Sequence, residues 1–366
     1  MKQVIKYAAV VFALVLAASI IGGCLTAGVG VVRMLVDKTE EQNGAERNGK
    51  EGNGLWYRDE DGDVVVFGVR LGNTGDVKSG TETFAASEIE SIQLEDMSGE
   101  LTVETWEQDY IEVWYEDIPE DYVIKKAGRT LVIENEVDFF FVNLSFVETP
   151  KIRIRVPADS VFEEVVIDKG SGSMKVSGIT ADVLEVDSGS GAVTISETDS
   201  EDFYVNSGSG SVNISRVNAE EISIDSGSGA VILSEVTAQN TILDSGSGTV
   251  TVKNSMTGET SVDTGSGFIS FEEVTAENMV LDSGSGRVNY IGWMTGECVF
   301  ETASGSVNLE VYGAEEDYNI RADLGSGGLY INGEKARDTE IEYADAENKL
   351  IFDTGSGRVS VKFNEK

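Results

Sequence analysis

The sequence predicts an all-β protein built as a parallel β-solenoid (β-helix) with 19-residue coils. Two observations predict this fold. The triplet Gly-Ser-Gly recurs at one spacing, starting at residues 170, 189, 208, 227, 246, 265 and 284, with a degenerate Ala-Ser-Gly at 303. Apolar residues alternate with polar ones on both sides of each triplet, which is typical of short strands with one buried face. A fixed period of about 20 residues indicates stacked repeats.

Two apolar columns show how each coil packs. Five residues before the last glycine of the triplets stand Val186, Val205, Ile224, Leu243, Val262, Leu281 and Phe300. Two residues after it stand Val193, Val212, Val231, Val250, Ile269, Val288 and Val307. β-branched side chains dominate both columns, so the sequence favours strand over helix here.

Two arrangements fit these columns. In a hairpin, Gly-Ser forms a two-residue turn and Val186 faces Val193. In a solenoid the triplet is a corner, and equivalent residues of successive coils stack about 4.8 Å apart. A third column favours the solenoid, because a hairpin leaves it in exposed loops. It holds Ile179, Val217, Val236, Val274, Trp293 and Tyr312, with Thr198 and Ser255 as exceptions. Glycine is expected at each corner because positive φ or a close approach between coils excludes a Cβ.

The chain before the repeat divides into three parts. Residues 1–36 predict a single transmembrane helix or a signal, since no charge interrupts Tyr7 to Val32 and a helix of that length exceeds the ~30 Å hydrocarbon core. Residues 37–54 predict a flexible linker, 55–167 an irregular β region of N-terminal coils, and 168–366 the regular solenoid. The sequence Ile-Gly-Gly-Cys at 21–24 leaves lipidation at Cys24 as an alternative to the uncut anchor. Both forms place the C-terminal ectodomain outside the cytoplasm, at the cell membrane.

Composition narrows the function. Asp and Glu number 65 against 27 Lys and Arg, a net charge of −38, so nucleic acid is not expected as a partner. Histidine is absent, which excludes Ser–His–Asp triads and His-ligated zinc sites. Cys298 stands in an apolar column and predicts a buried thiol. The aromatic residues Trp106, Trp114 and Tyr115 either close the end of the solenoid, the favoured interpretation, or form a sugar-binding strip.

An acidic column lies four residues before the last glycine of each triplet. It contains Asp168, Asp187, Asn206, Asp225, Asp244, Asp263, Asp282 and Glu301. Stacked at about 4.8 Å, neighbouring charges repel by about 0.9 kcal/mol in water. The favoured interpretation is that each Asp caps the amides of its own turn, as Asn206 can do without charge. The alternative is a calcium ladder between adjacent carboxylates, formed by Asp187, Asp225, Asp244, Asp263 and Asp282. No other cofactor is expected.

The N-terminal apolar run, the strand from Ile152 to Pro157 and the repeated D-S-G-S-G-x-V-x-I coils resemble the bacterial putative-adhesin family of unknown function. The resemblance implies a β-solenoid ectodomain linked to the cell envelope. We therefore expect a non-enzymatic, adhesin-like protein that presents an acidic face to cell-envelope polymers or surface proteins. The alternatives are an envelope-stress sensor or accessory subunit acting through a membrane partner, and a polysaccharide-active β-helix. A polysaccharide-active β-helix needs a Lys or Arg base in one groove with an acidic metal cluster. It is disfavoured because the basic residues Arg216, Lys253 and Arg287 occupy different columns.

Overall fold

The computed structural model describes residues 56–58, 64–66, 69–71, 77–96, 98–135 and 149–364. The predicted anchor at 7–32, the linker at 37–54 and Cys24 lie outside these residues. Within the described ranges, no helix has the length and apolarity needed to cross a membrane. The chain forms two units, Met1–Val77 with Val137–Glu148, and Lys78–Glu136 with Thr149–Lys366. The first contains a small antiparallel sheet of β1 (Trp56–Arg58), β2 (Val64–Val66) and β3 (Val69–Leu71).

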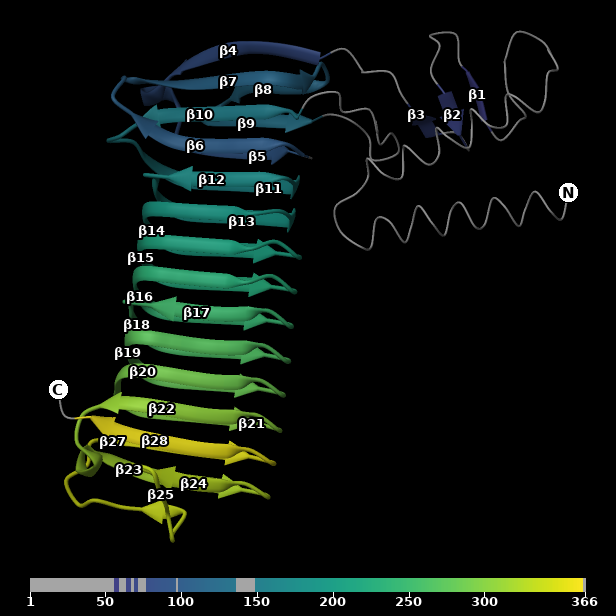
Figure 1. The fold of residues 1–366 in the computed structure, drawn as a ribbon. Helices are drawn as coiled ribbons and strands as arrows, with labels where there is room; N and C mark the ends of the chain where they lie inside the picture. The colour runs from purple at the N-terminus through teal and green to yellow at the C-terminus, as the bar shows by residue number, and fades with distance from the viewer. Residues whose placement is uncertain are drawn as a thin grey trace, which may run out of the picture. The chain divides into compact units, whose positions relative to one another are not determined.

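The second unit is a stack of β-coils (Figure 1). Its N-terminal elements are β4 (Val77–Ala85), η1 (Ala86–Glu88), β5 (Ser91–Asp96), β6 (Glu100–Trp106), β7 (Tyr110–Pro119), β8 (Tyr122–Ala127), β9 (Thr130–Asn135) and β10 (Lys151–Pro157). The repeated coils comprise β11 (Val161–Ser171), β12 (Ser173–Ser177), β13 (Thr180–Ser190), β14 (Val193–Ser207), β15 (Val212–Ser226), β16 (Val231–Ser245), β17 (Thr249–Lys253), β18 (Met256–Thr264), β19 (Phe268–Ser283), β20 (Arg287–Thr295), β21 (Glu297–Thr302) and β22 (Ser306–Tyr312). The C-terminal elements are η2 (Glu315–Asp317), β23 (Tyr318–Leu324), β24 (Gly328–Ile331), β25 (Glu334–Lys335), β26 (Glu340–Ile341), β27 (Asn348–Thr354) and β28 (Arg358–Asn364).

The repeated coils pair in parallel, with partners 19 residues apart. Val193 of β14 pairs with Val212 of β15, which pairs with Val231 of β16. Strand β13 pairs in parallel with both β11 and β14, so the hairpin alternative is wrong and the parallel solenoid is confirmed. The apolar columns form one continuous core between the two walls of each coil, because alternate side chains of every strand point inward.

The triplet corners are where successive coils approach each other most closely. A Cβ placed on Gly229, the last residue of its triplet, would lie 1.6 Å from the carbonyl oxygen of Gly210 in the preceding coil. A Cβ on Gly227, the first residue, would lie 2.5 Å from the oxygen of Gly208. The close approach between coils therefore requires glycine at this corner. The steric clash of an added Cβ would be worse at the last position of the triplet than at the first.

The opposite corner of the coil was missed by the sequence reasoning. One residue in each of six successive coils adopts positive φ there, and five of these are not glycine. They are Gly178 (φ 76°), Glu197 (58°), Arg216 (55°), Glu235 (57°), Asn254 (49°) and Glu273 (56°). The left-handed conformation costs a non-glycine residue about 1–2 kcal/mol, so the packing of the coils on either side offsets this strain.

We expect Glu235→Gly to raise the melting temperature slightly, because glycine adopts positive φ without strain. The matched control is Glu220→Gly, at an exposed position inside β15, where glycine weakens a strand by about 0.5–1 kcal/mol. Thermal unfolding followed by circular dichroism measures both. A larger loss for Glu235→Gly than for Glu220→Gly would contradict the left-handed corner.

The spatial order of the last coils differs from their order in the chain. β27 pairs in parallel with β21 on one side and β23 on the other, and β28 lies likewise between β22 and β24. The coil of β27 and β28, which is the last in the sequence, therefore lies in space between the coil of β21 and β22 and the coil of β23 and β24 (Figure 1). The outermost coil is covered by the two-residue strands β25 and β26, which pair with it antiparallel. Such cover blunts an edge that would otherwise pair with another chain.

The N-terminal end changes from parallel to antiparallel pairing. β10 pairs in parallel with β6 and antiparallel with β7, and the hairpin of β8 and β9 is added beside β5. Tyr122 fills the end of the core and Tyr115 packs against it. Trp106 and Trp114 instead lie on the outer face beneath Arg155 and Arg153, whose guanidinium carbons are 4.7 and 5.5 Å from the ring centroids. The interpretation that these two tryptophans close the end was wrong.

One residue of the third apolar column also departs from the prediction. Trp293 was expected in the core, but it is 41% exposed. A register shift between Glu272 and Val274 pairs Val274 with Gly292 and moves Trp293 opposite Thr275. A bulge of this kind reverses which face a side chain occupies. Tyr312 is buried as expected and contacts the Trp293 ring edge-on.

Candidate functional site: a carboxylate ladder

The acidic column forms a single ladder along one edge of the solenoid, just before the triplet corners. Parallel pairing places its members side by side in the spatial order Glu95, Asp168, Asp187, Asn206, Asp225, Asp244, Asp263, Asp282, Glu301, Asp353 and Asp323. We call this set the carboxylate ladder. Its side chains are exposed except for Asp187, which is half-buried. Ten of its eleven members are acidic, so the edge carries a row of negative charge that only Asn206 interrupts.

Three members of the ladder were missed by the sequence reasoning. Asp323 and Asp353 stand four residues before the last glycine of the triplets at 325 and 355, so the signal was present in the sequence. Glu95 precedes no triplet, but the turn that follows it contains Gly99, which stacks beneath Gly172. Only the three-dimensional order shows that these three residues extend the column at both ends.

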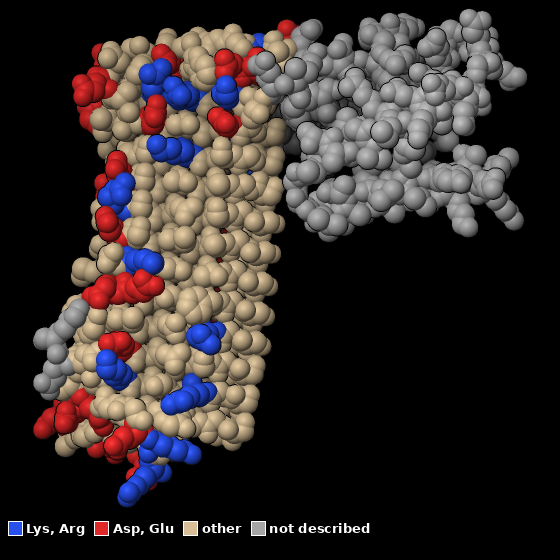
Figure 2. All heavy atoms as spheres, in the orientation of Figure 1, with Lys and Arg blue, Asp and Glu red and all other residues tan. Residues whose placement is uncertain are grey.

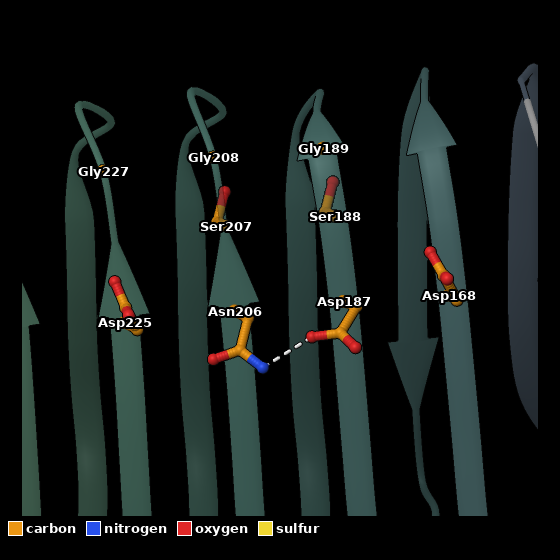
Figure 3. Close-up of a pocket in the computed structure, with 9 residues that line it drawn as sticks. All are labelled: Asp168, Asp187, Ser188, Gly189, Asn206, Ser207, Gly208, Asp225 and Gly227. Carbon is orange, nitrogen blue, oxygen red and sulfur yellow. Dashed lines mark hydrogen bonds between the residues drawn. The ribbon is translucent and has the colours of Figure 1, made fainter.

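The ladder borders a shallow groove of about 430 Å³ near its N-terminal end. The groove is lined by Asp168, Asp187, Asn206 and Asp225 together with the serines and glycines of the adjoining corners (Figure 3). The amide Nδ2 of Asn206 donates a hydrogen bond of 2.6 Å to Oδ1 of Asp187. Asn206 therefore separates the charges of Asp187 and Asp225 and links its own coil to the preceding one.

Turn capping by the ladder, the favoured interpretation, is wrong for the described residues. Corner amides donate instead to the neighbouring coil, as in Gly208 N to Ser188 O at 2.9 Å. Where a side chain accepts from a corner amide, it is the hydroxyl one residue after the ladder: Thr264 Oγ1 accepts from Gly267 at 3.2 Å and Ser283 Oγ from Gly286 at 3.1 Å. Among the described residues, the repulsion between ladder carboxylates is therefore not offset by the predicted hydrogen bonds from turn amides.

One carboxyl group in the middle of the ladder has a raised pKa. Partial burial, followed by the neighbouring carboxylates of Asp225 and Asp263, raises the pKa of Asp244. Among the described residues, no three Asp, Glu, His or Cys side chains are grouped closely enough to hold a metal ion. The calcium ladder of Asp187, Asp225, Asp244, Asp263 and Asp282 stays a prediction.

We expect Asp244→Asn to raise the melting temperature by about 2 °C at pH 7 and low salt, because it removes two repulsions of about 1 kcal/mol each in water. A raised folded-state pKa means that protonation favours the folded state. Acidification from pH 7 toward 3.8, the ordinary Asp value, should therefore stabilise the wild type more than Asp244→Asn. Melting curves across pH and salt measure this.

The matched control for that prediction is Asn206→Asp, which adds a charge to the ladder and removes the donor to Asp187. It should lower the melting temperature, and salt should reduce the loss. If millimolar calcium instead raises the wild-type melting temperature by several degrees, and the rise is smaller in Asp244→Asn, the ladder binds calcium.

The column next to the ladder points inward and ends in a buried ion pair. Its members are serine or threonine in most coils, but Lys169 and Asp96 occupy it in the first two. Their side chains are 0% and 2% exposed and form a salt bridge, and the hydroxyl of Tyr122 donates to the same Asp96 carboxylate. Sequence reasoning missed this pair, because Lys169 stands where the repeat has serine and Asp96 lies outside the repeat.

Cys298 is buried in the core, as the sequence predicted. Burial raises the pKa of its thiol to about 11. The neutral thiol therefore dominates at physiological pH, and this residue is a packing element.

These features define a class of protein: an all-β parallel solenoid whose corners carry a ladder of carboxylates. The family model described as Toastrack DUF4097 matches residues 89–242 and 231–350. The chain belongs to this family, and the predicted resemblance to the putative-adhesin family of unknown function is confirmed. No curated protein matches the chain.

Several solved structures resemble the chain, including the following three. One is described as a putative cell adhesion protein from Clostridium sporogenes, with 13% identity over 79% of this chain and 100% of the other, at a TM-score of 0.22. The second, a putative adhesin from Bacteroides fragilis, has 13% identity over 80% and 100% at a TM-score of 0.34. The third, a putative adhesin from Parabacteroides distasonis, has 13% identity over 79% and 98% at a TM-score of 0.36.

Proposed function

We propose that the chain is a membrane-anchored, extracytoplasmic and non-enzymatic protein with an adhesin-like, envelope-binding role. The observation that carries the proposal is the carboxylate ladder, which presents ten acidic side chains in one row on a rigid scaffold. A row of like charge is a multivalent surface, and it favours extended partners that carry positive charge. The uncharged run from Tyr7 to Val32 supports attachment to the membrane.

The partner that this surface fits is a cationic region of a cell-envelope polymer or of a surface protein. Each contact is exposed and therefore weak alone, on the order of 1 kcal/mol or less. Several contacts in register add up, because the coils hold their spacing without a cost in conformational entropy at binding. The strength of binding should therefore depend on how many neighbouring carboxylates remain.

The proposal is tested in cells that express the full chain. Protease added to intact, wall-stripped cells should remove the solenoid, whereas protection of the solenoid would reject the extracytoplasmic location. Binding to isolated envelopes should fall in the triple variant Asp225→Asn, Asp244→Asn, Asp263→Asn. The control triple variant Glu197→Gln, Glu235→Gln, Glu272→Gln removes the same charge away from the ladder and should keep binding. Equal binding by the wild type and both variants would reject the ladder as the contact surface.

A further inference from the structure

A row of four outward-facing side chains crosses the N-terminal coils, on a different wall from the carboxylate ladder. Trp114 of β7 pairs with Arg153 of β10, Arg153 pairs with Thr102 of β6, and Thr102 pairs with Lys175 of β12. We call these four residues the N-terminal row. Buried neighbours such as Val113 and Ile154 on the same strands show that the row faces outward.

The two cations of this row have little or no carboxylate to neutralise them. Arg153 approaches its one acidic partner, Glu104, only to 3.9 Å, and Lys175 forms no ion pair with any described residue. The adjacent cations Lys151 and Arg155, in contrast, hold Glu116 and Glu112 at 2.7 and 2.5 Å. In a chain with 65 acids and 27 bases, a cation left without a close carboxylate is unexpected.

The wall that continues from the row is poor in acids. The outward positions of β12, β17, β20, β22 and β28 carry no Asp, and neither do those of β14, β15, β16 and β19 that precede the positive-φ corner. Their two acids are Glu272 and Glu310, which pair with Lys253 and Lys362 at 2.9 and 3.2 Å. Serine, threonine and asparagine fill most of the other positions. In Figure 2 the middle of this face carries little charge, while Lys and Arg lie together with Asp and Glu over the N-terminal coils, and further Lys and Arg lie at the C-terminal end. An anion therefore meets far less repulsion here than at the ladder.

We propose that the N-terminal row binds a carboxylated polysaccharide. Arg153 lies over the Trp114 ring, 5.5 Å from its centroid, and stacking of this kind leaves the N–H edge of a guanidinium free for a carboxylate. Lys175 supplies a second charge roughly 10 Å away, across two strand spacings, which suits a chain of repeated carboxylates. The uncovered part of the Trp114 ring offers an apolar surface for a sugar. The hydroxyls of Thr102 in the row and of Thr194, which pairs with Lys175, are available for its polar groups.

The test uses the full chain in detergent, with polygalacturonate as the probe at about 0.15 M salt. The wild type should bind it, and Arg153→Gln with Lys175→Gln should weaken binding about tenfold or more, the loss expected for two charge-assisted hydrogen bonds. The control Arg321→Gln with Lys349→Gln removes the same charge from the ladder wall and should leave binding unchanged. No binding by the wild type, or an equal loss in the control, overturns the proposal.

Two further measurements separate a sugar from any other polyanion. Trp114→Leu keeps apolar bulk but removes the aromatic face, so it should weaken polygalacturonate binding while circular dichroism shows an unchanged fold. Full binding by Trp114→Leu, or equally tight binding of inorganic polyphosphate by the wild type, would overturn the assignment to a carboxylated sugar. The triple ladder variant should bind polygalacturonate at least as tightly as the wild type. Binding by the N-terminal row and binding by the ladder are therefore tested independently.

Discussion

A Gly229→Ala variant is expected to lose about 3 kcal/mol or more of folding free energy, because its Cβ would lie 1.6 Å from the carbonyl oxygen of Gly210. Backbone on both sides of the corner is held by parallel pairing, so the coils must separate locally to make room. Gly227→Ala should cost much less, since its Cβ would lie 2.5 Å from the neighbouring oxygen. The chain itself supports this difference: Ala303 replaces the first glycine of one triplet, whereas all ten triplets keep the last glycine.

Urea unfolding followed by circular dichroism measures both variants. The exposed Ser228, between the two glycines, provides the control, since Ser228→Ala should leave the midpoint unchanged. Equal destabilisation by Gly227→Ala and Gly229→Ala would show that the corner does not have the asymmetric contact described above.

The second large effect is expected at the buried ion pair of Lys169 and Asp96. Either Lys169→Ser or Asp96→Ser leaves one buried charge without its partner, which costs about 3–5 kcal/mol. The double variant gives both coils the residue that the repeat uses at this column, as in Ser188 and Ser207. It should therefore be more stable than the sum of the two single losses predicts, by about 2–3 kcal/mol.

A double-mutant cycle from equilibrium unfolding measures this coupling. Additive losses would mean that Lys169 and Asp96 do not depend on each other. Tyr122→Phe isolates the third member of the cluster, because it removes only the hydroxyl that donates to Asp96. Its loss should be the smallest in this set, about 1 kcal/mol.

The sequence was sufficient for the fold wherever the repeat was regular. A 19-residue period fixes parallel register, because each apolar column can be buried only if equivalent residues stack. The period says nothing about which coil lies outermost, so the insertion of β27 and β28 before β23 and β24 could not be predicted. The exposure of Trp293 follows from a single register shift, which leaves no mark on the spacing of the triplets.

The candidate site was predictable in position but not in its hydrogen bonding. The offset of the acids from the triplets located the ladder, and Asp323 and Asp353 share that offset. The partner of a corner amide depends on distances of a few tenths of an ångström between adjacent coils, so the sequence pattern did not distinguish Asp from the following Ser or Thr. The N-terminal row joins strands that lie far apart in the sequence, and no local spacing indicates it.

The central claim is that the ladder runs without a break through coils whose spatial order differs from their order in the chain. Disulfide formation between cysteines placed on the ladder tests it, in a background with Cys24→Ala and Cys298→Ala. Glu301→Cys with Asp353→Cys should cross-link readily on oxidation, because these residues are paired neighbours at a strand spacing that a disulfide accommodates. Glu301→Cys with Asp323→Cys should not, because β27 lies between the two strands. Rapid cross-linking of Glu301→Cys with Asp323→Cys, and none with Asp353→Cys, would contradict the account.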